Sequence, residues 1–230
     1  MRLSVIIPTL NESGHLDVLL DRMKKGALRK DVEILVVDGG SVDDTCAIAR
    51  KHQLKVYETA AGRARQMNLG ANKSSAEVLY FVHADTLPPV SYYDDIMQAL
   101  GEEADLGCYR FKFDSSHLLL KINAYFTRYD KMWCRGGDQS LFIRSEVFNA
   151  LGGYINDEVI MEEYTLLKKA MDRFKFVVMQ KDILVSARKY RNNGYFRVQF
   201  ANMVAFHMHR FGAESEKILQ TYRTLIKYRS

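Results

Sequence analysis

Short apolar runs recur along the first half of the chain, and stretches with helical spacing separate them. Four runs are rich in β-branched or aromatic side chains, as buried parallel strands are: residues 3–7, 33–37, 54–58 and 77–82. Helix-like stretches lie between them, at residues 13–23, 43–52 and 62–73. Alternating strands and helices predict an α/β fold with a mainly parallel central sheet flanked by helices.

The second half of the chain has a different pattern. Residues 105–114 alternate aromatic and basic side chains, which predicts a strand with one solvated face. Further strands are predicted at residues 138–144 and 174–179, and helices at 117–130 and 162–174. The last forty residues are expected to form two helices, the first with Phe196, Phe200, Met203, Val204 and Phe211, the second with Ile218, Leu219, Tyr222, Leu225 and Ile226. With no linker or repeat, residues 1–230 are expected to form a single domain.

The composition is that of one compact globular domain. The 230 residues are 47% hydrophobic and 27% charged, which is enough apolar material for a sizeable core. The three cysteines are odd in number and far apart, so a disulfide framework is not expected. We expect the protein to reside in a reducing compartment. No stretch reaches the ~18 apolar residues of a membrane span, and no secretory leader is recognisable. We therefore expect a cytoplasmic protein.

Basic residues are concentrated at the end of the chain. Residues 186–230 hold nine Lys or Arg and two Glu, a net charge of +7, which leaves −2 for the rest. This charge, interleaved with aromatic residues, predicts either peripheral contact with the inner face of a membrane or a homodimer formed through the C-terminal helices. A solvated helix face accounts for the charge equally well. No RNA- or DNA-binding motif accompanies it, so nucleic acid is not an expected partner.

Polar side chains follow three of the predicted strands. They are Pro8 to Glu12 after the first, Asp38 to Ser41 after the second, and His83 to Asp85 after the fourth. Because parallel strands end at one edge of a sheet, these segments predict a ligand site there. The glycine patterns of nicotinamide and P-loop sites are absent. Taken singly, each segment could also be ordinary turn or helix-start chemistry.

His83 and Asp85 predict a divalent cation, Mn²⁺ or Mg²⁺. In an extended segment, residues two apart point the same way and can face one ion. A carboxylate suits Mg²⁺ or Mn²⁺, and an imidazole shifts the preference toward Mn²⁺. The alternative is a strand-to-turn exit in which Asp85 bonds local amides.

Together these stretches resemble the inverting glycosyltransferases of family 2, which have the GT-A fold and use nucleotide-diphosphate sugars. SVIIPTLNES, ILVVDGGSVDDT, GRARQMNLGA and VHADT match the nucleotide-binding half of that family in order, and RGGDQSLFIRSEVFNALGGY and IMEEYTLLKKA match its acceptor half. The nearest subgroup is the small soluble bacterial members with a GRARQMN helix. The resemblance implies a nucleotide-binding half at residues 1–100, an acceptor and catalytic half at 101–190, and C-terminal helices at 191–230.

The resemblance also implies roles for particular residues on the donor side. The nucleotide-binding set would be Pro8, Thr9, Glu12, Asp38, Gly62, Arg63, Arg65 and Arg188. Asp85 matches the last aspartate of the DxD motif that holds the metal on the diphosphate, whereas His83 departs from its first aspartate. For the two arginines of the GRARQMN stretch, a solvated helix face is the alternative.

On the acceptor side, the family's base is the aspartate of a Glu-Asp pair that opens a helix. Here Glu163 aligns with that aspartate, and either it is the base or Glu162 has taken the task. Sugar or acceptor contacts are expected from Gly136, Gly137, Asp138 and Gln139. Trp133 either stacks on a sugar or fills the core, and we expect the core.

The implied function is metal-dependent, inverting transfer of a sugar from a nucleotide-diphosphate sugar donor to the hydroxyl of an unknown acceptor. The alternative is a non-catalytic nucleotide-sugar-binding module derived from such an enzyme.

Overall fold

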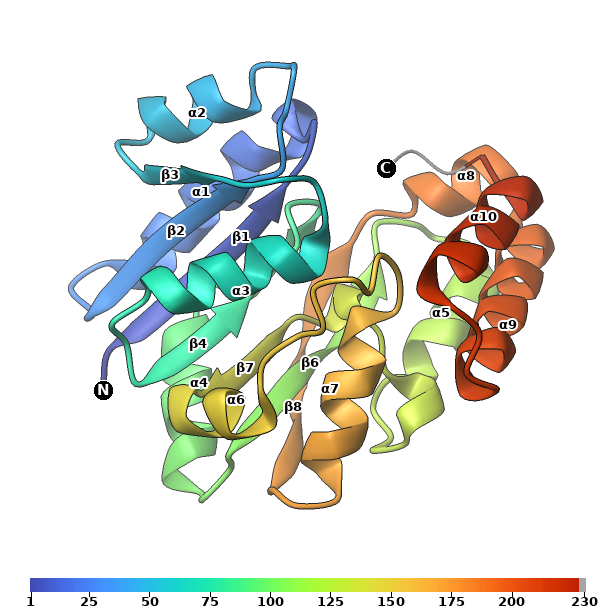
Figure 1. Cartoon of the computed structure of the whole chain (residues 1–230). Helices are drawn as coiled ribbons and strands as arrows, with labels where there is room; N and C mark the ends of the chain where they lie inside the picture. The colour runs from blue at the N-terminus through green and yellow to red at the C-terminus, as the bar shows by residue number, and fades with distance from the viewer. Residues whose placement is uncertain (228–230) are drawn as a thin grey trace.

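One mixed β-sheet runs through the computed structural model, which describes residues 1–227 (Figure 1). Its eight strands lie in the order β3-β2-β1-β4-β7-β6-β8-β5. They span Leu3–Thr9 (β1), Val32–Asp38 (β2), Lys55–Glu58 (β3), Val78–Phe81 (β4), Thr86–Leu87 (β5), Leu106–Phe113 (β6), Leu141–Arg144 (β7) and Phe176–Val185 (β8). The four strands predicted in the first half of the chain are therefore confirmed.

The sheet is parallel in its first half and mixed in its second. β3, β2, β1 and β4 are neighbours and parallel, so their carboxyl ends share one edge. β7 is antiparallel to both β4 and β6, β6 is parallel to β8, and β5 pairs antiparallel with β8. Four of these seven pairings are parallel. The predicted α/β fold is confirmed, with more antiparallel pairing than a doubly wound sheet has.

Helices cover both faces of this sheet. They span Ser13–Ala27 (α1), Thr45–Lys51 (α2), Arg63–Lys73 (α3), Tyr92–Gly101 (α4), Leu118–Phe126 (α5), Ser145–Leu151 (α6), Glu162–Met171 (α7), Arg188–Asn193 (α8), Tyr195–Arg210 (α9) and Ser215–Leu225 (α10). Two short 3₁₀ helices span Met132–Cys134 (η1) and Gly137–Gln139 (η2).

Alternating side chains of the central strands build a core on each face of the sheet. Val5 and Ile7 pack with residues of α1 and α4, whereas Ile6 between them packs with residues of α3, α6 and α7. α3 approaches β1 so closely that a Cβ on Gly70 would lie 2.4 Å from Ile6 Cγ2. Only glycine fits there without displacement, and this contact fixes α3 over the strands that lead to the polar edge.

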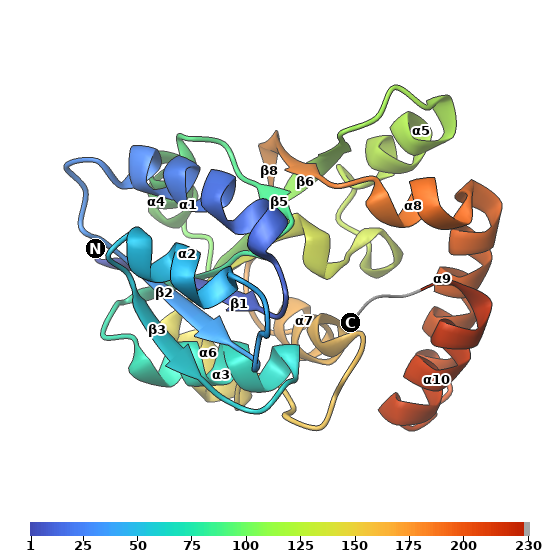
Figure 2. The ribbon, with the colours of Figure 1, turned by 90° about the horizontal axis from the view of Figure 1, so that it is seen from above.

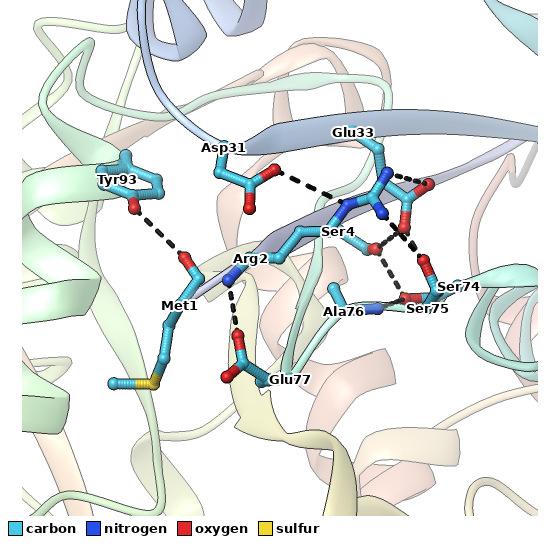
Figure 3. A network of polar contacts seen from close by, with 10 residues as sticks. All are labelled: Met1, Arg2, Ser4, Asp31, Glu33, Ser74, Ser75, Ala76, Glu77 and Tyr93. Carbon is cyan, nitrogen blue, oxygen red and sulfur yellow. Dashed lines mark hydrogen bonds and ion pairs between the residues drawn. The ribbon is translucent and has the colours of Figure 1, made fainter.

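A polar network closes the opposite edge, where the first strands begin (Figure 3). The Arg2 guanidinium lies 3.7 Å from Asp31 and 3.6 Å from Glu33, and its backbone nitrogen donates to Glu77 at 2.7 Å. These contacts tie together the starts of β1, β2 and β4.

The C-terminal helices form a separate layer at the far end of the molecule from β3 (Figures 1 and 2). α9 and α10 are the two helices predicted there, and they share a small core that includes Val198, Ala201, Ile218 and Tyr222. Within residues 1–227, no helix combines the length and apolar character needed to cross a bilayer.

Two expectations for residues 130–144 were wrong. Trp133, expected in the core, lies on η1 with 60% of its surface exposed. The strand predicted at 138–144 begins only at Leu141, because the chain makes the η2 turn first.

Candidate functional site

Asp38 organises the loop that follows β2. Its carboxylate accepts hydrogen bonds from the backbone nitrogens of Gly40 and Ser41 at 2.9 and 2.7 Å and from Thr9 Oγ1 at 3.0 Å. Burial raises the pKa of Asp38, but the hydrogen bonds from Ser41, Thr9 and Gly40 outweigh burial and hold the pKa below its usual range. The turn chemistry considered for this residue is therefore present, and contact with a nucleotide base stays a prediction.

Gln66 ties the ends of β1 and β2 together and was not singled out from the sequence. Its Nε2 donates to the backbone oxygens of Thr9 and Val37, both at 2.7 Å. The side chain is buried beside Gly39. The signal was present, because Gln66 is the glutamine of the GRARQMN stretch.

The rest of α3 holds the loop that leads into α7. Asn68 donates to the backbone oxygen of Tyr154 at 2.8 Å and accepts from its backbone nitrogen at 3.0 Å. Arg65 lies 2.8 Å from Asp157, and Arg63 lies 3.1 Å from Glu162. The polar side of the GRARQMN helix therefore faces carboxylates and backbone of residues 154–162.

Gly62 is the N-cap residue of α3 and has a φ of 146°. A side chain there would be strained, so glycine is required by the backbone. Arg63 and Arg65 follow it, each with a side chain 43% exposed, and they pair with Glu162 and Asp157. Contact of these arginines with a nucleotide stays a prediction.

His83 is buried and lies between two carboxylates. β4 ends at Phe81, and residues 83–85 turn, with the Thr86 backbone nitrogen donating to the His83 oxygen at 3.1 Å. The His83 Nε2 is 3.3 Å from Glu163 Oε1, and its Nδ1 is 3.9 Å from Asp138 Oδ1. The extended geometry expected for residues 83–85 is absent, and His83 faces carboxylates.

The protonation states in this cluster follow from burial and from these neighbours. Burial and the charge of Arg63 lower the pKa of His83, but Asp138 and Glu163 outweigh them and raise it to about 9. Burial raises the pKa of Glu163, but His83, followed by Arg63, outweighs burial and lowers it. His83 is therefore a cation and Glu163 an anion at neutral pH.

Glu162 differs from its neighbour. Its side chain is only 1% exposed, and burial, with the charge of Glu163, raises its pKa despite the Arg63 guanidinium. Glu162 and Glu163 open α7 as expected. The helix start places both carboxylates beside the end of β4.

Asp85 stands on the open side of the same edge, partly exposed. Burial raises the pKa of Glu12, and the charge of Asp85 raises it further, so these two carboxylates are close enough to repel. Arg188 Nη2 lies 3.9 Å from Glu12 Oε1, which brings the start of α8 to the carboxyl end of β1. The three residues come from distant parts of the chain, as the sequence analysis expected.

The residues expected to contact sugar divide into an exposed and a buried set. Asp138 is partly exposed beside His83. A Cβ added to Gly136 would have no atom within 4 Å, so the space beside this glycine is open. Gly137 opens η2. Gln139 is only 1% exposed, and its Nε2 donates to the Tyr109 backbone oxygen at 3.0 Å. Contact of this side chain with a sugar stays a prediction.

A small pocket lies under these residues. Glu163, Gln139 and Arg135 line it, together with His83 and Gly136. Glu163 Oε1, Gln139 Oε1 and Arg135 Nε are buried there without a hydrogen-bond partner in the described part of the chain. The free space is about 10 Å³, which is close to what one water molecule needs.

Strained backbone flanks the site. Asn11, Ser140 and Met161 have φ values of 55°, 58° and 61°, although none is glycine. Such conformations cost about 1–3 kcal/mol each and are kept where surrounding structure imposes them. Here they directly precede or follow candidate residues at the ends of β1, η2 and the start of α7.

Comparison with known proteins gives the same family as the sequence motifs. Residues 4–152 match the model of "Glycosyl transferase family 2". The chain is 36% identical over 91 residues to the 4,4'-diaponeurosporenoate glycosyltransferase of Staphylococcus haemolyticus, covering 36% of this chain and 24% of the relative. It is 25% identical over 176 residues to the succinoglycan biosynthesis protein ExoA of Rhizobium meliloti, covering 65% and 52%. The chain thus spans between a quarter and about half the length of these relatives.

Solved structures share the fold across nearly the whole chain. A mannosyltransferase of Pyrobaculum calidifontis in complex with GDP-Man and Mn²⁺ superposes with a TM-score of 0.70 at 20% identity, over 97% of this chain and 69% of that one. Glucosyl-3-phosphoglycerate synthase of Mycobacterium tuberculosis, with Mn²⁺, UDP and phosphoglyceric acid, gives 0.66 at 18% identity, over 92% and 79%. Because the family model matches more than half of this chain, the chain belongs to glycosyl transferase family 2.

Proposed function

We propose that this protein is a metal-dependent, inverting glycosyltransferase that moves a sugar from a nucleotide-diphosphate sugar to an acceptor hydroxyl. The observation that supports it best is the pair of buried carboxylates at the start of α7, facing His83 and Arg63 at the carboxyl-end edge. Burying several charged groups together is costly, and such clusters are characteristic of catalytic sites. The family relationship gives the reaction class.

The donor would lie over the ends of β1, β2 and β4. Pro8 and Thr9 end β1, and the loop built on Asp38 ends β2, so both would line the nucleoside pocket. Arg188 is half exposed next to Glu12 and could pair with a phosphate, since a guanidinium matches phosphate geometry. Arg63 and Arg65, with Gly62 before them, close the other side.

Asp85 fits a divalent cation, and His83 does not. Two carboxylates that repel each other at an open edge, Asp85 and Glu12, favour a cation between or near them. Both ring nitrogens of His83 face carboxylates, and a protonated imidazole has no lone pair to give a metal. No group of three or more metal-binding side chains occurs within residues 1–227, so phosphate oxygens would complete the coordination. When bound, Mn²⁺ or Mg²⁺ neutralises charge on the departing diphosphate.

Glu163 is the base in this proposal. It is ionised, because His83 and Arg63 lower its pKa, and its Oε1 lies 3.3 Å from His83 Nε2. An acceptor hydroxyl that hydrogen-bonds to it would lose its proton as the oxygen attacks the anomeric carbon. Glu162 holds Arg63 and has a raised pKa, which suits a supporting role. Asp138 and Gly136, on the exposed side, would contact the sugar or the acceptor.

Donor hydrolysis tests the proposal without knowledge of the acceptor. The protein is incubated with UDP-, GDP- and dTDP-sugars in Mn²⁺, and release of nucleoside diphosphate is measured. A transferase releases it slowly from one class of donor, because water takes the place of the acceptor. A non-catalytic binding module instead gives a donor-induced rise in melting temperature with no release. If no donor is bound and no nucleoside diphosphate is released, both the transferase and the binding-module hypotheses are contradicted.

A further inference from the structure

Two helices at the far end of the molecule carry apolar side chains to the surface. Phe196, Phe200 and Met203 on α9 and Phe211, which follows its last residue, are exposed, Phe196 to 77% and Phe211 to 83%. Their spacing of four, three and eight residues places them on one side of the helix. The small residues that pack on α10, such as Ala201, are on another side. α9 is therefore apolar on a face that nothing covers within residues 1–227.

α5 carries a second apolar stripe at the same end. Its exposed residues recur at helical spacing and continue into the next turns: Leu118, Ile122, Tyr125, Phe126, Tyr129 and Trp133. Phe126 and Trp133 lie with ring centroids 5.9 Å apart. The helix starts are joined by His117 and Tyr195, which stack at 6.2 Å. Both views show α5 and α9 at the end away from β3 (Figures 1 and 2).

The charge on these two segments is predominantly positive. Residues 115–133 and 195–211 contain five basic residues, all exposed, and one acidic residue: Lys121, Arg128, Lys131, Arg197, Arg210 and Asp130. Aromatic side chains interleaved with Lys and Arg match a surface with an apolar interior and an anionic rim. A second copy of this chain would bring the same basic residues against each other, which opposes pairing through this face.

We propose that the α5–α9 face, defined by the exposed apolar residues of α5, η1 and α9, docks on the surface of a bilayer that contains anionic lipids. The aromatic rings would enter the headgroup region while the flanking guanidinium and ammonium groups meet lipid phosphates. Phe206 of α9 packs on Tyr164, the residue after Glu163, with centroids 5.7 Å apart. Docking would therefore hold the start of α7 near the membrane surface.

Vesicle binding tests this directly, without reference to catalysis. The full chain is sedimented with vesicles of phosphatidylcholine alone and with added phosphatidylglycerol, at low and high salt. We expect binding only to the anionic vesicles, weakened by salt. Trp133 is the single tryptophan, so its emission should shift to shorter wavelength on docking and be quenched by brominated lipid.

Matched variants locate the face. Phe196→Ser combined with Phe200→Ser should lower partitioning by on the order of tenfold or more, because two aromatic rings are lost from the interface. Val42→Ser, at an exposed valine near α2, should leave it unchanged. All three substitutions are at exposed positions, and the melting temperature of each variant verifies folding.

Three results would overturn the proposal. The first is absence of sedimentation with anionic vesicles at low salt. The second is vesicle binding that the phenylalanine variant does not weaken. The third is a dimer in light scattering that this variant converts to monomer while vesicles are not bound, which would assign the face to a second copy.

Discussion

The Nε2 atom of His83 lies 3.3 Å from Oε1 of Glu163, which joins the end of β4 to the start of α7. A buried cation beside a buried anion keeps each charged. Because His83 occupies the position of the first aspartate in the motif that the sequence resembles, this chain places a positive group there. The contact therefore suggests that His83 positions the proposed base instead of the metal.

Replacing the proposed base should abolish turnover and spare binding. Glu163→Gln removes the carboxylate but keeps nearly the same shape, so the rate of nucleoside diphosphate release should fall by about 10²–10⁴-fold. Nucleotide affinity, measured by calorimetry, should be unchanged. Glu146→Gln, at an exposed glutamate on α6, is the control and should retain full activity. Full activity in the Glu163 variant would move the base role to Glu162.

Arg63 and Glu162 should be coupled in stability. Arg63→Met leaves the buried Glu162 carboxylate without its partner at 3.1 Å and should lower the free energy of unfolding by about 1–3 kcal/mol. Glu162→Gln in the same chain should recover part of this loss, because the neutral amide needs no cation. Urea denaturation of the single and double variants measures the coupling. Strictly additive effects would show that the ion pair does not stabilise the fold.

Asp38 should make the fold sensitive to acid. Its pKa is lowered in the folded chain, so its hydrogen bonds stabilise the protein above the unfolded aspartate pKa of about 3.9, and this contribution is lost as the pH falls through the folded value. Asp38→Asn should cost about 1–3 kcal/mol at neutral pH and progressively less below pH about 4. Thermal melts across this range measure the difference. A pH-independent difference would contradict the assigned cause, and Asp130→Asn, at an exposed site, is the control.

Much of the fold follows from the sequence because its strands are strongly patterned. Runs of buried β-branched residues located β1 to β4, and helical spacing located α1, α3, α9 and α10. The pattern did not single out α8, at Arg188–Asn193, because it is short and polar and buries none of its residues. β5, with two residues, is defined only by its pairing with β8.

The sequence indicated which strand ends share an edge, but not the side-chain contacts made there. Strand order placed Asp38 and Asp85 at one edge, as the sequence implied. The alternation rule failed at His83 because the strand ends before it and the chain turns. Gln139 is polar in the sequence, yet only the folded chain shows that its amide is used by the Tyr109 backbone oxygen. Such long-range partners depend on tertiary packing, which a local pattern does not contain.

Calorimetric titration of nucleoside diphosphates, with and without Mn²⁺, tests the central claim most directly. The account predicts that UDP or GDP binds only when the cation is present, and that Asp85→Asn abolishes this dependence together with most of the affinity while Asp130→Asn does not. Binding that is equally tight in a chelator, or an Asp85→Asn variant that retains the cation dependence, would contradict it.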